Sequence, residues 1–254
     1  MNVLIDYLST WLFKNKLSPN VNKTKLMLFT VKQVDVFPNI YFNNTILEWT
    51  NTFKYLGILL DSKLNFGQHC NCVLKRLSQA YDVIYSIHSF IPRNVLIKIY
   101  YSIVYPILIQ NIIIWGGVAR SNKINIIIML NKIMRCILNV KSNQLNIPLI
   151  STTDTYKKLK LLKFDDIYVL KFIHFVFYKN DKFFNDYFLD LLPTHNYETR
   201  NVRIQLPKVR LEVYKQFVIH KACKLINEIP ESFLSLQSNN MLKKNFKEFC
   251  LNKY

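Results

Sequence analysis

Glycine and acidic residues are both scarce in this sequence, and each scarcity narrows the class of protein. The 254 residues include only 4 glycines, against an average share of about 7%. Few glycines mean few tight hairpins and few phosphate-cradling loops, which favours helices. No Ser-His-Asp order, glycine-rich phosphate loop or pair of catalytic carboxylates stands out in the sequence. Hydrolase and kinase functions therefore have no support.

The shortage of acidic residues leaves a large positive charge. Lys and Arg number 34 against 16 Asp and Glu, which gives a formal net charge of +18 and a pI near 9.6. Such a surplus is typical of proteins that bind a polyanion, either nucleic acid or an anionic membrane surface. An AT-rich genome would also enrich Lys together with Asn and Ile, so a purely compositional origin of the charge stays open.

The cysteines and the first residues bear on the compartment and on metal binding. Five cysteines, an odd number spread over a long chain, favour a reducing compartment over a disulfide framework. Residues 1–12 lack the features of a signal peptide. We expect an intracellular protein, in the nucleus or cytoplasm and not secreted. His69, Cys70 and Cys72 lie close together, but a zinc site usually needs four ligands and the other cysteines are isolated, so we expect no metal ion or other cofactor in this chain.

The pattern of apolar residues predicts an α+β fold that is mostly α. Half of the residues are hydrophobic, which is ample for a packed core. A helix is expected over residues 2–15, and short strands are expected at 26–31, at 34–36 and 40–42 around a turn, and at 53–61. Gly57 within the last strand indicates a bulge or the close approach of another backbone. One face of the first helix collects Val3, Leu4, Tyr7, Leu8, Trp11 and Leu12.

Beyond residue 66 the apolar spacing changes to three and four residues, which predicts helices. Pro92, the pair Gly116-Gly117 and Pro148 mark boundaries between them. Ser121 is the expected N-cap of the third helix, and Asp154 or Thr155 that of the fourth. The expected helices are 69–91, 93–115, 123–140, 154–178, 211–227 and 240–252.

Four blocks of residues follow one another in a characteristic order. Residues 11–25 match W-x-x-x-N-K-L-x-x-N-x-x-K-T-K, residues 53–61 match F-K-Y-L-G-I-x-x-D, residues 99–116 end in W-G, and residues 195–200 match H-x-Y-x-T-R. In this order the blocks resemble those of the LINE-like, jockey-type non-LTR retrotransposon reverse transcriptases. In that family the first block follows the catalytic strand, the second lies at the boundary of palm and thumb, the third is the thumb helix and the fourth lies beyond it. The chain resembles the C-terminal part of such an enzyme: palm edge, thumb and following region.

The resemblance implies three domains. Residues 1–66 would be a palm remnant with a primer-grip-like strand, residues 67–145 a helical thumb, and residues 146–254 a helical C-terminal region.

The resemblance also implies that the catalytic part lies elsewhere. The polymerases of this family hold two metal ions on carboxylates, one pair of them in an aromatic-x-Asp-Asp hairpin, and that hairpin would lie just before Met1. Asp165-Asp166 fails the pattern, because Lys163 stands where the aromatic residue belongs, and a solvated helix face is the expected role of this pair. We expect no polymerisation by this chain alone, although Mg²⁺ would be expected for the full-length polymerase.

The partner implied by the resemblance is an RNA/DNA template–primer duplex, with no small-molecule substrate. Residues 53–58 would belong to the primer-gripping element, and Lys23 would lie near the incoming nucleotide. Thumb helices hold a duplex through phosphate contacts, which need Lys and Arg. Beyond the thumb, His195, Tyr197 and Arg200 are candidates for stacking or pairing with nucleic acid. The candidate binding residues are Lys23, Lys54, Tyr55, Gly57, Lys75, Arg76, Arg93, Lys98, Arg120, Lys123, Lys132, Arg135 and Arg200.

Two other functions compete with this interpretation. The first is a basic single-span membrane protein, because no charged residue occurs in residues 99–119 and a membrane span needs roughly 20 residues. Gln110 and Asn111 would then sit near the bilayer centre, and the next helix carries Lys132 and Arg135, so we favour a buried thumb helix and expect no membrane association. The second is a host-adopted interaction module without retained enzymology.

Overall fold

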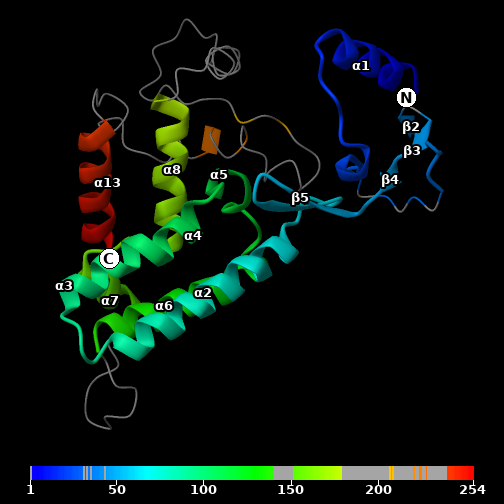
Figure 1. The fold of residues 1–254 in the computed structure, drawn as a ribbon. Coiled ribbons are helices and arrows are strands. Elements are labelled where there is room, and N and C mark those ends of the chain that lie inside the picture. The colour runs from blue at the N-terminus through cyan, green and yellow to red at the C-terminus, as the bar shows by residue number, and fades with distance from the viewer. Residues whose placement is uncertain are drawn as a thin grey trace, which may run out of the picture. The chain divides into compact units, whose positions relative to one another are not determined.

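The fold is taken from a computed structural model. It describes residues 2–139 except 31, 33, 35 and 43, residues 151–178, residues 239–254, and the single positions 206, 208, 220, 223, 224 and 227. The chain separates into two compact units, Met1–His69 and Cys70–Tyr254. Short strands occur in the first unit and helices dominate the second (Figure 1), which confirms the predicted α+β, mostly α fold.

The first unit combines one helix with short strands. Helix α1 (Asn2–Lys14) leads to a single 3-10 turn, Val21–Lys23, and then to the strands. Strand β1 pairs in parallel with β4, while β2–β3 and β5–β6 are antiparallel hairpins. The strands are β1 (Lys25–Leu26), β2 (Tyr41–Phe42), β3 (Thr45–Ile46), β4 (Glu48–Trp49), β5 (Thr52–Tyr55) and β6 (Ile58–Asp61).

The core of this unit uses only part of the apolar face predicted for α1. Ile40, Phe42 and Leu47 are buried, and Ile5 and Leu12 of α1 pack against them. Leu12 belongs to the predicted face, whereas Ile5 does not. Four other members of that face are exposed, namely Leu4, Tyr7, Leu8 and Trp11. The helix itself is confirmed, and its contacts with the core come from more than one of its sides.

The predicted strands needed two corrections. The expected strand 26–31 is limited to Lys25–Leu26, and Val34 and Val36 lie outside any strand. The expected single strand 53–61 is a hairpin, in which Tyr55 pairs with Ile58. Leu56 (φ 46°) and Gly57 (φ 86°) form its turn. A two-residue hairpin turn of type I′ needs positive φ at both central positions, so Gly57 serves the turn and marks no bulge.

Asp61 at the end of β6 organises the loop that leads to the next helix. Its carboxylate accepts hydrogen bonds from the backbone N–H groups of Lys63, Asn65 and Phe66, at 3.1, 3.1 and 2.7 Å. Leu64 and Phe66 adopt positive φ in this loop, so the carboxylate holds a conformation that ordinary side chains disfavour. The Asp of the F-K-Y-L-G-I-x-x-D block thus has a structural role here.

The second unit begins with a long helix, as predicted. Helix α2 (Gly67–Ile87) buries Val73, Leu77 and Ile84 on one face. These residues recur at the spacing that placed them together in the sequence, which confirms the prediction.

The predicted continuous helix 93–115 is interrupted twice. Helix α3 (Arg93–Ile99) runs into a π-helical turn η2 (Tyr100–Val104), because Pro106 has no N–H to donate to the preceding turn and Tyr105 N–H bonds to the Tyr100 carbonyl instead. Helix α4 (Tyr105–Ile109) then ends at Gln110.

The second interruption is a sharp break. Asn111 takes the left-handed conformation, with φ 53° and ψ 26°, before the short helix α5 (Ile112–Trp115) begins. Asn tolerates this conformation better than most residues. The break positions Trp115, which is fully buried and donates its indole N–H to the Gln110 carbonyl at 2.8 Å.

Gly116 explains the Trp-Gly sequence at the end of this segment. A Cβ atom here would lie 2.6 Å from the Ile112 carbonyl oxygen and 2.6 Å from the ring of Tyr168 in helix α8 (Phe164–Tyr178). No side chain fits so close a contact, so glycine allows α5 to pack directly against α8.

The remaining helices differ from the prediction mainly at their caps. Helix α6 (Arg120–Ile137) starts before Ser121, which lies inside it. The expected helix 154–178 is two helices, α7 (Thr152–Leu159) and α8 (Phe164–Tyr178), because Lys160 turns to the left-handed conformation at φ 54°. Ser151, and neither Asp154 nor Thr155, is the N-cap of α7, with its hydroxyl 3.0 Å from the Asp154 N–H.

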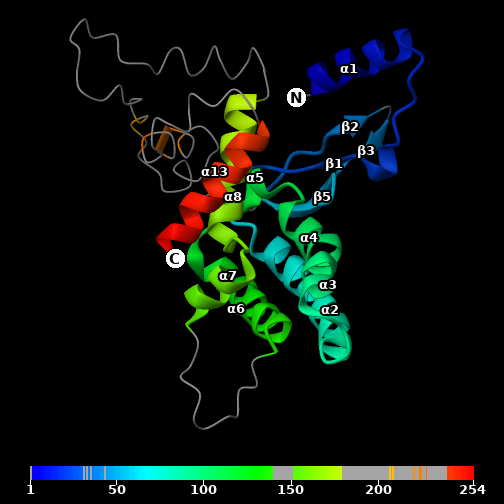
Figure 2. The same ribbon diagram turned by 90° about the vertical axis from the view of Figure 1, so that its left-hand side faces the viewer.

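The last helix, α13 (Asn239–Lys253), confirms the expected helix 240–252. It lies beside α8 in both views (Figures 1 and 2) and buries Leu242, Phe246 and Cys250 against Leu170 and Ile173. The expected helix 211–227 and the H-x-Y-x-T-R block at 195–200 lie outside the described residues.

Within the described ranges, no helix has the length and apolar character needed to cross a membrane. The stretch proposed as a span, residues 99–119, comprises a π turn and two short helices separated by the break at Asn111. This contradicts the alternative of a single membrane-spanning helix there.

We predict that Asp61→Ala loosens the loop after β6. Three backbone N–H groups would lose one buried acceptor, at a cost of about 1–3 kcal/mol. Amide hydrogen exchange at Lys63, Asn65 and Phe66 is expected to accelerate at least about fivefold. Asp82→Ala, at an exposed position of α2, is the control and should leave these rates unchanged. Unaltered protection in Asp61→Ala would show that the carboxylate does not hold the loop.

Candidate nucleic-acid interface

The tip of the β5–β6 hairpin brings three of the predicted binding residues together. Lys54 and Tyr55 are exposed at the end of β5, and Gly57 follows in the turn. The Tyr55 side chain is 57% exposed and Leu56 beside it is 77% exposed. A solvent-facing aromatic ring next to a lysine is an arrangement that can contact both a base or sugar and a phosphate.

Lys23 lies in the 3-10 turn of the same unit, and the residues on either side of it cap this turn. The Asn20 side chain accepts the Lys23 N–H at 3.1 Å, and the Thr24 hydroxyl donates to the Asn20 carbonyl at 2.9 Å. Lys25 forms an ion pair with Glu48 across β1 and β4. Within the N-x-x-K-T-K block, Lys23 is therefore an exposed cation on a capped turn.

The predicted thumb residues lie on the outer surface of α2, α3 and α6. Lys132 and Arg135 share one exposed face of α6 at i, i+3 spacing. Arg76 on α2 donates to the Gln110 side chain at 2.8 Å, and Arg93 approaches the Leu138 carbonyl at 3.5 Å. The exposed basic residues of this group are Lys75, Arg76, Arg93, Lys98, Arg120, Lys132 and Arg135.

Lys123 differs from that group because a carboxylate neutralises it. Its ammonium lies 2.6 Å from the carboxylate of Asp165, and its side chain is only 14% exposed. The Tyr254 hydroxyl donates to the other carboxylate of the pair, that of Asp166. The two acids thus have separate partners on different sides of α8. Asp165 is exposed, as expected for a solvated helix face, whereas Asp166 is half-buried against Tyr254. The two carboxylates do not form a shared metal site.

The described residues include no group of three or more His, Cys, Asp or Glu side chains placed to hold a metal ion. The Leu59 N–H donates to Nδ1 of His69 at 3.3 Å. Burial raises the pKa of the Cys70 thiol to about 11.

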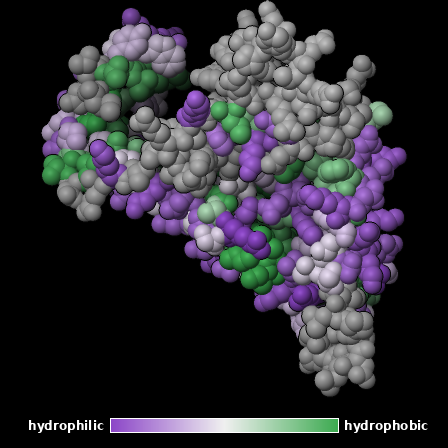
Figure 3. All heavy atoms as spheres, turned by 180° about the vertical axis from the view of Figure 1, so that it is seen from behind, coloured by the Kyte–Doolittle hydropathy of each residue, from purple (hydrophilic) through white to green (hydrophobic). Residues whose placement is uncertain are grey.

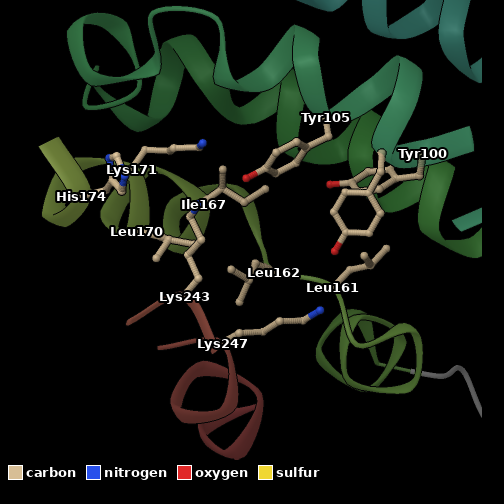
Figure 4. Close-up of a pocket in the computed structure, with 11 residues that line it drawn as sticks. Tyr100, Tyr105, Leu161, Leu162, Ile167, Leu170, Lys171, His174, Lys243 and Lys247 are labelled. Carbon is tan, nitrogen blue, oxygen red and sulfur yellow. The ribbon is translucent and has the colours of Figure 1, made fainter. Parts of the chain in front are cut away.

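A second basic cluster, which the sequence did not reveal, surrounds a cavity of about 160 Å³ in the helical unit. Lys171 and His174 come from α8, and Lys243 and Lys247 from α13 (Figure 4). Tyr100, Tyr101 and Tyr105 of η2 and α4 line the other side, with leucine and isoleucine side chains between. The i, i+4 pair on α13 was visible in the sequence, but its approach to tyrosines some 140 residues earlier was not.

The cations around this cavity repel one another. Burial lowers the pKa of Lys171, and the charge of Lys243 lowers it further. Burial and then Lys160 lower the pKa of Lys247. Burial lowers the pKa of His174, and the charges of Lys243 and Lys171 lower it further. None of the described residues that line the cavity is acidic, so an anion would relieve this repulsion.

The surface of the described helices is mainly hydrophilic on the face drawn in Figure 3, with a compact hydrophobic patch near its middle. Exposed apolar side chains of this unit include Val83, Tyr101, Ile103, Ile114 and Ile128. Arg200, with His195 and Tyr197, lies outside the described residues.

Comparison with known proteins finds relatives of the kind that the four sequence blocks indicate. The chain is 33% identical over 141 residues to a probable RNA-directed DNA polymerase from transposon BS of Drosophila melanogaster, a match that covers 53% of this chain. It is 27% identical over 134 residues, 52% of this chain, to the RNA-directed DNA polymerase from mobile element jockey of Drosophila funebris. The jockey polymerase of Drosophila melanogaster is 33% identical over 99 residues, 35% of this chain.

Over about half its length, this chain is similar to jockey- and BS-type non-LTR retrotransposon RNA-directed DNA polymerases. The matches span only 16%, 14% and 10% of the lengths of those polymerases. No protein-family model matches the chain, and no solved structure matches it significantly. The resemblance read from the sequence is confirmed.

The charge repulsion around the cavity gives a testable titration. His174 should titrate below its ordinary pKa of 6.5, and Lys243→Gln should raise its pKa because one neighbouring cation is removed. In the wild-type chain, the lowered pKa means that the folded state binds fewer protons at His174 than the unfolded state does. The free energy of unfolding should therefore fall as the pH drops through 6.5. NMR titration of the His174 ring measures the shift. Lys244→Gln, on the same helix but outside the cavity lining, should leave it in place, and equal His174 pKa values in both variants would contradict the repulsion.

Proposed function

We propose that this chain is the template–primer-holding part of a retrotransposon reverse transcriptase, with its helical unit acting as the thumb. The supporting observation is the set of exposed basic side chains on α2, α3 and α6 of a chain that is similar to RNA-directed DNA polymerases. Its partner would be an RNA/DNA duplex inside the cell, in the nucleus or cytoplasm.

The charges available for phosphate contacts are those without an acidic partner. The ion pairs found among the described residues use Lys25 and Lys123. Lys75, Lys98 and Lys132 are exposed and form no ion pair with a described acidic residue. Such cations bind the phosphate backbone and carry no sequence information, which suits an enzyme that must copy any template.

The hairpin tip of the first unit would act as the primer-gripping element. Lys54 offers a cation and Tyr55 an exposed ring. Both precede the tight turn at Leu56 and Gly57, so they lie at the tip of the hairpin. Lys23 is the corresponding candidate near the incoming nucleotide. These roles follow from the family resemblance and from the exposure of the three side chains.

The described carboxylates give no support for polymerase chemistry by this chain alone. Asp61 holds a loop, Asp165 pairs with Lys123, and Asp166 accepts from Tyr254. Two-metal catalysis needs acidic side chains that converge on the ions. We infer that the full-length polymerase supplies these acids, with Mg²⁺, from another part.

Duplex binding by the 254-residue chain should depend steeply on salt. Removing one cation that binds a phosphate lowers the slope of log K against log[salt] by about 1. Lys132→Gln combined with Arg135→Gln should therefore reduce the slope by about 2 and weaken binding at all sequences alike. Fluorescence anisotropy with an RNA/DNA hybrid at several salt concentrations measures both quantities.

The control for this experiment is Lys157→Gln with Lys158→Gln. These lysines are exposed on α7, carry the same charge and lie outside the proposed interface. An equal reduction of slope in both double variants would mean that binding follows net charge and not the thumb face.

Primer extension by the chain alone should be absent. A primed RNA template with all four deoxynucleotides and Mg²⁺ would give no product above background, because converging carboxylates are missing from the described residues. A recombinant jockey-type polymerase serves as the positive control. Any Mg²⁺-dependent product from the 254-residue chain would disprove this part of the account.

A further inference from the structure

We propose that the cavity between η2, α4, α8 and α13 receives one base of a single-stranded nucleic acid, while Lys171, Lys243 and Lys247 bind the neighbouring phosphates. This inference rests on the proposed function only for the class of ligand. Its site is separate from the proposed duplex-binding residues on α2, α3 and α6.

The size of the cavity limits its occupant to one ring. Its volume is about 160 Å³, close to the engineered apolar cavities of about 150 Å³ that bind benzene. Ligand pockets that enclose whole drug-sized molecules are larger, at roughly 300–1,000 Å³. A single pyrimidine ring has the size to fill this space, and the sugar and phosphates would then lie at the rim.

The walls of the cavity suit a flat ring. Tyr101 and Tyr105 lie edge to face, with ring centroids 5.5 Å apart, and Tyr101 keeps 42% of its surface exposed. Ile167 and Leu161 supply apolar surface on the other side (Figure 4). Stacking of a base on an aromatic side chain tolerates any base, because each has a π-face.

The rim of the cavity carries the charge that phosphates need. Lys171 extends from α8 toward Tyr105 (Figure 4), with its ammonium 5.8 Å from the centre of that ring. Lys243 and Lys247 reach the cavity from α13. Burial lowers the pKa of Lys171, and the nearby charge of Lys243 lowers it further. A bound phosphate would offset the repulsion between these two lysines.

A single strand fits this combination better than the alternatives. A base in a duplex is stacked and paired, and its removal from the helix costs a few kcal/mol. Inorganic phosphate would leave the tyrosine-lined interior unfilled, and an acidic peptide offers carboxylates without a planar ring for it. An unpaired strand offers both an accessible base ring and a phosphate in every nucleotide.

The test is fluorescence anisotropy of the full 254-residue chain with labelled 12-nucleotide oligo(dT) and with an abasic strand of the same length. Wild type should bind oligo(dT) at least about fivefold more tightly than the abasic strand, as expected for one stacked base. Lys171→Gln with Lys247→Gln should weaken oligo(dT) binding about tenfold, whereas the charge-matched control Lys157→Gln with Lys158→Gln, outside the cavity lining, should change it less than twofold.

A second pair of variants separates stacking from folding. Tyr105→Phe keeps the ring and should bind oligo(dT) like wild type, while Tyr105→Leu should lose most of the preference over the abasic strand. Circular dichroism melting shows whether each variant is folded. Equal binding of oligo(dT) and the abasic strand by wild type, or unchanged binding in the double lysine variant, would overturn the proposal.

Blunt RNA/DNA duplex is measured in the same series to keep the two proposals apart. Loss of single-strand binding with intact duplex binding in the double lysine variant supports the cavity. Absence of duplex binding in wild type would contradict the thumb function and would leave the oligo(dT) comparison valid.

Discussion

The break in the helix at Gln110 and Asn111 is the constraint on which the helical unit depends. A straight helix would carry Ile112–Trp115 past the bundle, but the left-handed Asn111 turns this segment inward. Trp115 is then buried and donates its indole N–H to the Gln110 carbonyl. The centroids of the Trp115 and Phe164 rings lie 5.4 Å apart. Gly116 closes the contact with α8. Because α8 is fixed in this way, α13 can pack along it, and the tyrosines of η2 and α4 form one wall of the cavity.

The two basic surfaces of this unit differ in how far their cations are exposed to solvent. On α2, α3 and α6 the cations are exposed and spaced along helices, an arrangement for long-range attraction to a phosphate backbone. Around the cavity, Lys171 and Lys247 are half-buried. Burial lowers the pKa of both, and the charge of Lys243 lowers the pKa of Lys171 further. The first surface needs only a polyanion, whereas the second also requires a ring of the right size. A polymerase that handles both paired and unpaired template would use both.

Helical periodicity made much of the fold predictable, and backbone exceptions made the rest unpredictable. Val73, Leu77 and Ile84 were placed correctly because i, i+4 and i, i+7 spacing is a local property. The break at Asn111 and the turn at Lys160 were not foreseen, since neither residue type by itself ends a helix and the left-handed conformation at each position depends on packing.

The candidate site was predictable only in part. Lys54 stands in a block that carries the family resemblance, and Lys132 stands in a helix expected to belong to the thumb, so both were candidates for an exposed position. The cavity could not, because Tyr105 and Lys247 are distant in sequence and belong to no common motif. The exposed side of α1, with Tyr7 and Trp11, shows the same limit: periodicity identifies an apolar face but not the surface that covers it.

The most direct test of the central claim is lysine footprinting of the 254-residue chain with and without an RNA/DNA duplex. Acetylation rates at single lysines, read by mass spectrometry, report which cations the phosphates cover. The account predicts slower modification of Lys75, Lys98 and Lys132, with Lys157 and Lys158 unchanged. Uniform protection of all these lysines, or protection of Lys157 and Lys158 alone, would contradict it.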